Sequence, residues 1–163
     1  MANNHTAGTA ARTFAPSELC QRMLAKTSKG TCGPCILYLE DGTIFYGRAC
    51  GAEGTATGEV CFNTSLEGYF EVMTDPSYAG QIVTMTYPQI GNYGIDETDV
   101  QSAFPGDAVR PASAPAMRGM IVRDMCATPS NWRSAVSVPE YLRARGIVAI
   151  EGVDTRALVR HLR

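Results

Sequence analysis

Apolar and polar residues alternate along much of this chain in short runs, which predicts strands rather than long helices. The first two runs, Ile36–Leu39 and Ile44–Ala49, flank the dipeptide Asp41-Gly42. Because glycine adopts positive φ without strain, this dipeptide predicts a tight hairpin turn between two paired strands. The other predicted strands are Val60–Phe62, Gln81–Tyr87, Met120–Val122 and Ile147–Ile150.

Three segments show the apolar spacing and the end signals of helices. The first is predicted to begin at Ser65, whose side chain would cap it, and to run to about Met73, with Pro76 beyond its end. The other two are predicted to start at Pro139 and after a capping Asp154. Several short strands and three helices in mixed order predict an α+β domain.

The two ends of the chain differ in composition from its middle. Residues 1–34 are mostly small and polar, and we expect a disordered or weakly helical leader there. The stretch Gly91–Met117 is long and rich in glycine and proline, so it predicts an excursion from the core. The last helix has about two turns before Arg163. Helices this short rarely hold alone, so we expect the chain to be cut near a domain boundary.

Length and charge narrow the function classes. A chain of 163 residues suits one domain that buries roughly two thirds of its unfolded surface. Its formal net charge of -2 argues against a nucleic-acid partner, because binding phosphates needs an excess of basic residues. No apolar run approaches the ~18 residues that a membrane span requires. Neither nucleic acid nor membrane is therefore an expected partner.

The six cysteines are expected to be reduced thiols, because residues 1–30 lack the apolar core of a secretory signal peptide. We therefore expect a cytoplasmic protein. The charged residues of the leader are almost all basic, with Glu18 the exception. An organelle-transit segment is kept as a minor alternative for that reason.

Cys32-Gly-Pro-Cys35 has the spacing of thioredoxin-type redox motifs, in which the start of a following helix stabilises the thiolate. Here the motif precedes the predicted strand Ile36–Leu39, and no βαβ pattern surrounds it. No second Cys-x-x-Cys and no nearby histidine completes a zinc site, so no metal site is predicted. A stand-alone thiol redox module using Cys32 and Cys35 stays open as an alternative function.

Nucleophilic catalysis needs a nucleophile activated by a fixed histidine. The two histidines are His5, in the leader, and His161, close to the end of the chain. Cys50 in GRACGAEG is the nearest imitation of a nucleophile, but it enters a Gly-rich loop rather than a helix. We assign no catalytic residue and predict that the chain is inactive alone.

The densest polar geometry lies between Gly58 and Gly94. Asp75 favours an Asx-type turn and Pro76 fixes its backbone, so the hydroxyl of Ser77 is expected to stand on a rigid corner. A helix-stop turn in which Ser77 only bonds the backbone is the alternative. Further along, a strand exit with two glycine turns carries side chains that suit an interface. The candidate interface residues are Tyr87, Asn92 and Tyr93.

Four segments of the chain together resemble one protein family. They are LYLEDGTIFYGRACG from Leu37, TDPSYAGQIV from Thr74, TYPQIGNYG from Thr86, and YLRARGIVAIEGVDTRALVRHLR at the end of the chain. They are similar to the N-terminal domain of the small, glutamine-hydrolysing subunit of carbamoyl-phosphate synthetase. Residues 1–34 and Phe104–Met117 lie outside the resemblance.

The resemblance implies stacked β/β/α layers of the swivelling type over residues 35–153, and at 154–163 the start of a linker helix toward an amidotransferase domain. It implies that Ser77 contacts glutamine, which that domain binds for the most part and hydrolyses. The implied partners are glutamine, the amidotransferase domain and the large synthetase subunit. ATP and metal are expected on the large subunit, so no cofactor is predicted in this chain.

The function that the resemblance implies is docking onto the large subunit and completing the glutamine site. The whole assembly would make carbamoyl phosphate from glutamine, bicarbonate and ATP, for arginine and pyrimidine synthesis. A non-catalytic adaptor that has lost its amidotransferase domain is the remaining alternative.

Overall fold

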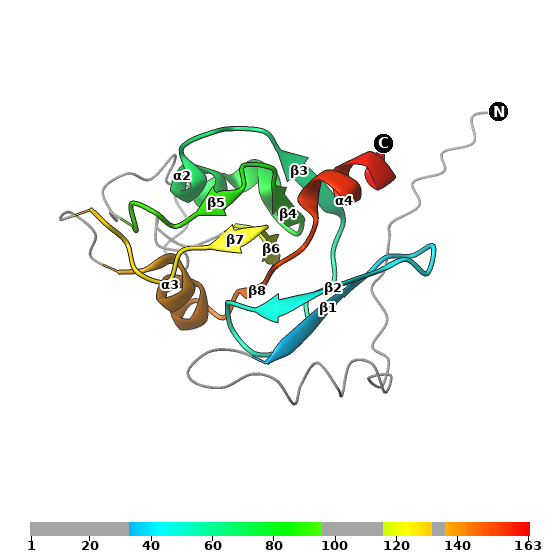
Figure 1. Ribbon diagram of the computed structural model, residues 1–163, viewed down its shortest axis with the longest axis horizontal. Coiled ribbons are helices and arrows are strands. Elements are labelled where there is room, and N and C mark those ends of the chain that lie inside the picture. The colour runs from blue at the N-terminus through cyan, green and yellow to red at the C-terminus, as the bar shows by residue number, and fades with distance from the viewer. Residues whose placement is uncertain (1–32, 96–115, 132–135) are drawn as a thin grey trace.

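A computed structural model of the chain describes residues 33–95, 116–131 and 136–163 (Figure 1). Cys32, His5 and most of the Gly91–Met117 stretch lie outside these ranges. The strands are β1 (Pro34–Tyr38), β2 (Ile44–Ala49), β3 (Val60–Asn63), β4 (Ile82–Met85), β5 (Gln89–Ile90), β6 (Gly119–Ile121), β7 (Asp124–Met125) and β8 (Val148–Glu151). The helices are α2 (Tyr69–Thr74), α3 (Val138–Ala144) and α4 (Thr155–Leu162), with one 3₁₀ turn, η1 (Pro76–Tyr78).

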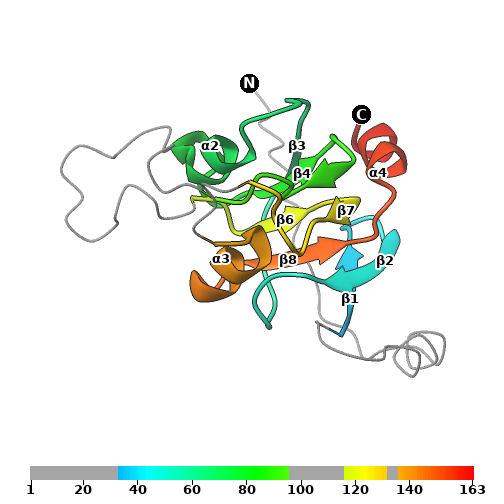
Figure 2. The same cartoon turned by 60° about the vertical axis from the view of Figure 1, so that its left-hand side comes forward.

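Six strands form one mixed sheet in the order β1-β2-β8-β6-β4-β3. The β1–β2 hairpin joins β8 in antiparallel fashion, whereas β8, β6, β4 and β3 run parallel to one another. A separate sheet is made by β5 and β7. Figure 2 shows α2 and α3 on one side of the parallel strands and α4 on the other. This mixed sheet of short strands with three helices in the described residues confirms the predicted α+β class.

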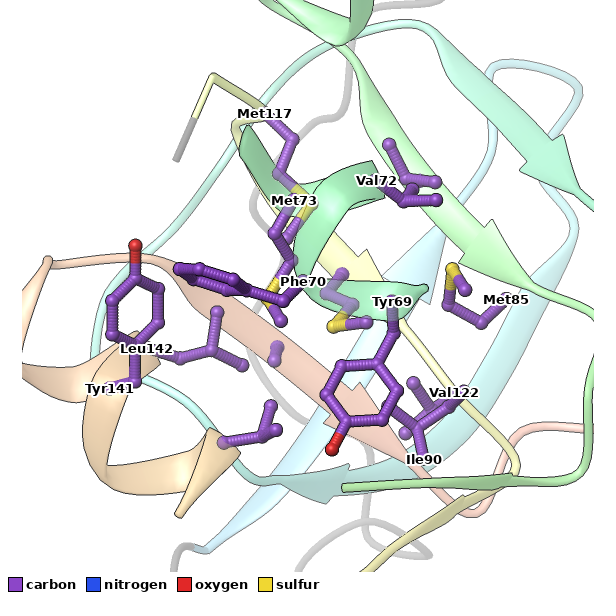
Figure 3. Packing of buried hydrophobic residues seen from close by; sticks show 14 of the residues in the cluster. Tyr69, Phe70, Val72, Met73, Met85, Ile90, Met117, Val122, Tyr141 and Leu142 are labelled. Carbon is purple, nitrogen blue, oxygen red and sulfur yellow. The ribbon is translucent and has the colours of Figure 1, made fainter. Parts of the chain in front are cut away.

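Alternate side chains of the parallel strands divide the core into two clusters. On β4, Val83 and Met85 belong to the first cluster, whereas Ile82 belongs to the second. Helix α4 closes the second cluster with Leu158, which is fully buried. Helices α2 and α3 close the first cluster, as Figure 3 shows, with Tyr69, Phe70, Val72, Met73, Tyr141 and Leu142. The helices thus stay in place through tertiary burial rather than through their own short length.

The predicted turn at Asp41-Gly42 closes the β1–β2 hairpin. The amide of Leu39 donates to the carbonyl of Thr43 (2.9 Å), and the amide of Gly42 donates back to the carbonyl of Leu39 (3.0 Å). Gly42 has a φ of 92°, the positive value that favours glycine. Asp41 accepts hydrogen bonds from the backbone amide of Thr43 (2.9 Å) and from its hydroxyl (3.1 Å). Its Oδ2 also lies 2.6 Å from Nε2 of His161, so the hairpin tip meets the end of α4.

Asp41→Asn is expected to lower stability at neutral pH and to lose that effect in acid. The backbone amide of Thr43 above all, and then its hydroxyl and His161, hold the pKa of Asp41 below its ordinary value of 3.8 in the folded chain. A carboxyl with a lowered pKa stabilises the fold above its unfolded pKa, and the contribution disappears as pH falls through the folded value. Urea midpoints of both proteins at pH 7 and below pH 3 check this. An unchanged difference between the two pH values would contradict it.

The prediction that Ser65 caps the helix before Met73 is wrong. Helix α2 begins only at Tyr69, after Gly68 in the left-handed region (φ 75°). The amide of Ser65 instead donates to Oδ1 of Asn63 (2.7 Å), an Asx-type turn that competes with helix formation. Leu66, which the sequence placed on the buried helix face, is 72% exposed.

The other two helices start where the sequence predicts. Ser137 and Glu140 form a capping box at the start of α3, and their hydrogen bonds hold the pKa of Glu140 below its ordinary value. The side chain of Asp154 accepts from the amide of Ala157 (2.9 Å) and caps α4. In the parts of the chain that the structure describes, no helix is long and apolar enough to cross a membrane.

Candidate functional site

The corner that carries Ser77 lies between α2 and β4. Oδ1 of Asp75 accepts hydrogen bonds from the Ser77 amide (2.8 Å) and from the Ser77 hydroxyl (2.7 Å). Pro76 opens η1, and the amide of Tyr78 donates to the Asp75 carbonyl (3.1 Å). No residue of η1 is buried, and Ser77 is exposed. The predicted Asx-type turn is therefore confirmed, while the role of Ser77 as a ligand stays a prediction.

A second polar segment is tied to this corner from the end of β3. The side chain of Asn63 donates from Nδ2 to the hydroxyl of Tyr78 (2.9 Å) and accepts at Oδ1 from the amide of Ser65 (2.7 Å). Its backbone carbonyl accepts from the amide of Thr86 (3.0 Å), just beyond β4. The sequence shows both polar segments, but nothing local indicates that Asn63 joins them.

Tyr93 performs the capping that Ser65 does not. Its hydroxyl oxygen accepts hydrogen bonds from the amides of Gly68 (3.0 Å) and Tyr69 (3.2 Å), at the start of α2. The rings of Tyr93 and Tyr69 stack with centroids 4.1 Å apart, and the Tyr69 hydroxyl donates to the Gly94 carbonyl (2.7 Å). Burial raises the pKa of both tyrosines, so both hydroxyls stay protonated at neutral pH. The hydroxyl of Tyr93 is thus engaged inside the domain.

The other two candidate interface residues stand at the surface. Tyr87 is 38% exposed at the exit of β4, and Asn92 is exposed. The backbone carbonyl of Asn92 accepts hydrogen bonds from the amide (2.9 Å) and the hydroxyl (3.1 Å) of Ser130. These bonds fix the loop and leave the amide side chain of Asn92 exposed. Tyr87 and Asn92 therefore have the exposure that an interface requires, and their role stays a prediction.

The described residues hold no arrangement suited to nucleophilic or metal chemistry. His161 contacts Asp41 and Thr43, on the hairpin, rather than a thiol. Cys50 is buried in the first core cluster, and burial raises the pKa of the Cys61 thiol, which disfavours a thiolate. Among the residues with described positions, no three His, Cys, Asp or Glu side chains gather as metal ligands would.

Comparisons with known proteins agree on one family. Residues 37–163 match the family described as carbamoyl-phosphate synthase small chain, CPSase domain. The carbamoyl phosphate synthase small chain of Solidesulfovibrio magneticus is 56% identical over 128 residues, which are 78% of this chain and 32% of that protein. The protein of the same name from Thermotoga maritima is 53% identical over 128 residues, 78% of this chain and 30% of the relative. The chain thus spans about a third of the length of the curated relatives it matches.

Proposed function

This chain belongs to the carbamoyl-phosphate synthase small-chain family, and from that membership we propose that it docks onto a large synthetase chain and completes a glutamine site there. The observation that carries the proposal is the match over residues 37–163, which includes the whole Ser77 corner. The corner is exposed and already held in shape by Asp75. A hydroxyl held in advance can contact a ligand with little further loss of conformational freedom.

The chemistry is divided between this chain and its partners. The thiolate and histidine that hydrolyse glutamine belong to an amidotransferase domain, and this chain contributes the serine that closes the site. The released ammonia is combined with bicarbonate and ATP to give carbamoyl phosphate for arginine and pyrimidine synthesis. ATP and its metal ions bind the large chain. By itself this chain is expected to release no ammonia from glutamine.

The proposed docking face contains Tyr87 and Asn92, whereas Tyr93 acts behind it by fixing the start of α2. Tyrosines at the centre of an interface often contribute most of its binding energy. The exposure of Tyr87, together with the fixed loop at Asn92, supports this assignment. A flat loop held by backbone hydrogen bonds loses little freedom when it binds.

Tyr87→Ala is expected to weaken binding to the large synthetase chain by about 30-fold, the effect of losing one central aromatic contact. Sedimentation or calorimetric titration with the unmodified chain should first show a complex at micromolar concentration. Tyr46→Ala is the matched control, because Tyr46 is also 38% exposed but lies on β2. Equal losses for the two variants, or a complex that forms unchanged with Tyr87→Ala, would contradict the assigned face.

The redox alternative has less support than this proposal. Cys35 belongs to strand β1 and packs against the second core cluster, so no helix follows it to stabilise a thiolate. Its companion Cys32 lies outside the described residues. The family match supports the synthetase function and provides none for a thiol module.

A further inference from the structure

We propose that Asn63 is a positioning residue for Ser77 and that it acts through the hydroxyl of Tyr78. The inference rests on the proposed role of Ser77 in the glutamine site. It assigns a function in that site to the end of β3, which supplies neither the serine nor the turn that carries it.

The hydrogen bonds of Asp75 fix the shape of the corner but not its place on the domain. Both bonds from Ser77 to Asp75 lie within the turn, and η1 has no buried residue. Tyr78 is the member of η1 that packs against the first core cluster. The ring of Tyr78 is therefore the part of the turn that connects Ser77 to the body of the domain.

The hydroxyl of Tyr78 is held by a residue that is itself fixed on every side. Asn63 pairs with Met85 at the end of the parallel β3–β4 ladder, and its carbonyl accepts from the amide of Thr86. Its Oδ1 accepts from the amide of Ser65 (2.7 Å), which identifies the other terminal atom as the nitrogen that faces Tyr78. Three hydrogen bonds thus aim one N–H group of Asn63 at the Tyr78 hydroxyl, 2.9 Å away.

This geometry links the position of Ser77 to the edge of the sheet. If the bond is removed, the turn keeps its internal bonds but loses a polar anchor beside the ligand. Sites of this kind work only when their groups are held within about 0.5 Å of the productive position. The expected signature is weaker glutamine use with no effect on the chemistry that follows ammonia release.

Tyr78→Phe in the enzyme assembled from this chain, an amidotransferase domain and the large synthetase chain tests the proposal. The variant keeps the ring and removes only the hydroxyl. We expect the KM for glutamine to rise about fivefold, as for the loss of one hydrogen bond, while synthesis from added ammonia keeps its rate. Tyr87→Phe, which removes a hydroxyl from an exposed ring outside η1, is the matched control and should leave both rates unchanged.

A double-mutant cycle separates positioning from general loosening. Asn63→Ala should raise the KM for glutamine at least as much as Tyr78→Phe, because it also frees Ser65. In the Asn63→Ala background, Tyr78→Phe should have no further effect, since the two changes break the same bond. Additive effects of the two substitutions would overturn the proposal.

Hydrogen exchange at the Ser77 and Tyr78 amides of the isolated chain gives a readout that does not depend on glutamine. Tyr78→Phe should speed exchange at these two amides and leave the amides of β4 protected. Unchanged exchange overturns the positioning role. If Ser77→Ala raises the KM for glutamine and Tyr78→Phe does not, the positioning role fails while the proposed function stands. If neither raises it, the assignment of Ser77 to the glutamine site fails, and the positioning of Ser77 for glutamine falls with it.

Discussion

Gly51→Ala is expected to destabilise the chain by at least about 4 kcal/mol, enough to prevent folding of an ordinary domain. A Cβ at Gly51 would stand 2.4 Å from the carbonyl oxygen of Ile147 and 2.7 Å from the amide nitrogen of Ala149. Both atoms are backbone of the segment that forms β8, so neither can rotate away. The amides of Cys50 and Ala52 donate to the carbonyls of Ala149 (2.9 Å) and Ile147 (2.8 Å), which extends the contact of β2 with β8 through Gly51.

Urea or thermal unfolding followed by circular dichroism measures this effect. Gly33→Ala is the matched control, because a Cβ at Gly33 meets nothing within 4 Å, and we expect a change within about 0.5 kcal/mol. The sequence alone suggests that Gly51 belongs to a flexible turn. A Gly51→Ala protein as stable as the control would support that interpretation and contradict the close approach.

Phe70→Ala is expected to cost about 3–5 kcal/mol, the range for removing a buried phenyl ring. Phe70 is 2% exposed, and its ring meets the ring of Tyr141 edge to face, with centroids 5.5 Å apart and an interplanar angle of 82°. The contact joins α2 to α3 across the first core cluster (Figure 3). Alanine would leave a cavity at the point where the two helices meet.

Leu66→Ala provides the control for Phe70→Ala, since Leu66 precedes the same helix but is 72% exposed. The free energy of unfolding from urea titration should change by less than about 0.5 kcal/mol in Leu66→Ala. The sequence pattern predicts the opposite importance, because it places Leu66 on the buried face. Equal losses in the two variants would show that the helix begins near Ser65 after all.

The sequence predicts those elements whose signals are local. Asp41-Gly42 closes a hairpin in the structure because glycine at a φ of 92° suits the turn whatever surrounds it. Asp154 caps α4 because the donor it satisfies lies three residues along the same chain. The strands β5 and β7 have only two residues each, so they carry no period that a pattern can show.

The elements that the sequence misses depend on distant partners. The start of α2 is capped by Tyr93, 25 residues beyond Gly68, while the nearer Ser65 is held by Asn63. The same limit applies to the candidate site. The Asx-type turn at Asp75 is local and was predictable, whereas the bond from Asn63 to Tyr78 joins two strands' ends and appears only in three dimensions.

The central claim is that Ser77 forms part of a glutamine site whose reactive groups lie on another domain. The most direct measurement is steady-state synthesis of carbamoyl phosphate by the assembled enzyme carrying Ser77→Ala, with glutamine and, separately, with ammonia as nitrogen donor. We predict that the KM for glutamine rises about tenfold, as for the loss of a hydrogen bond to a charged ligand, and that synthesis from ammonia is unchanged. An unchanged KM for glutamine, or an equal loss with both donors, would contradict the account.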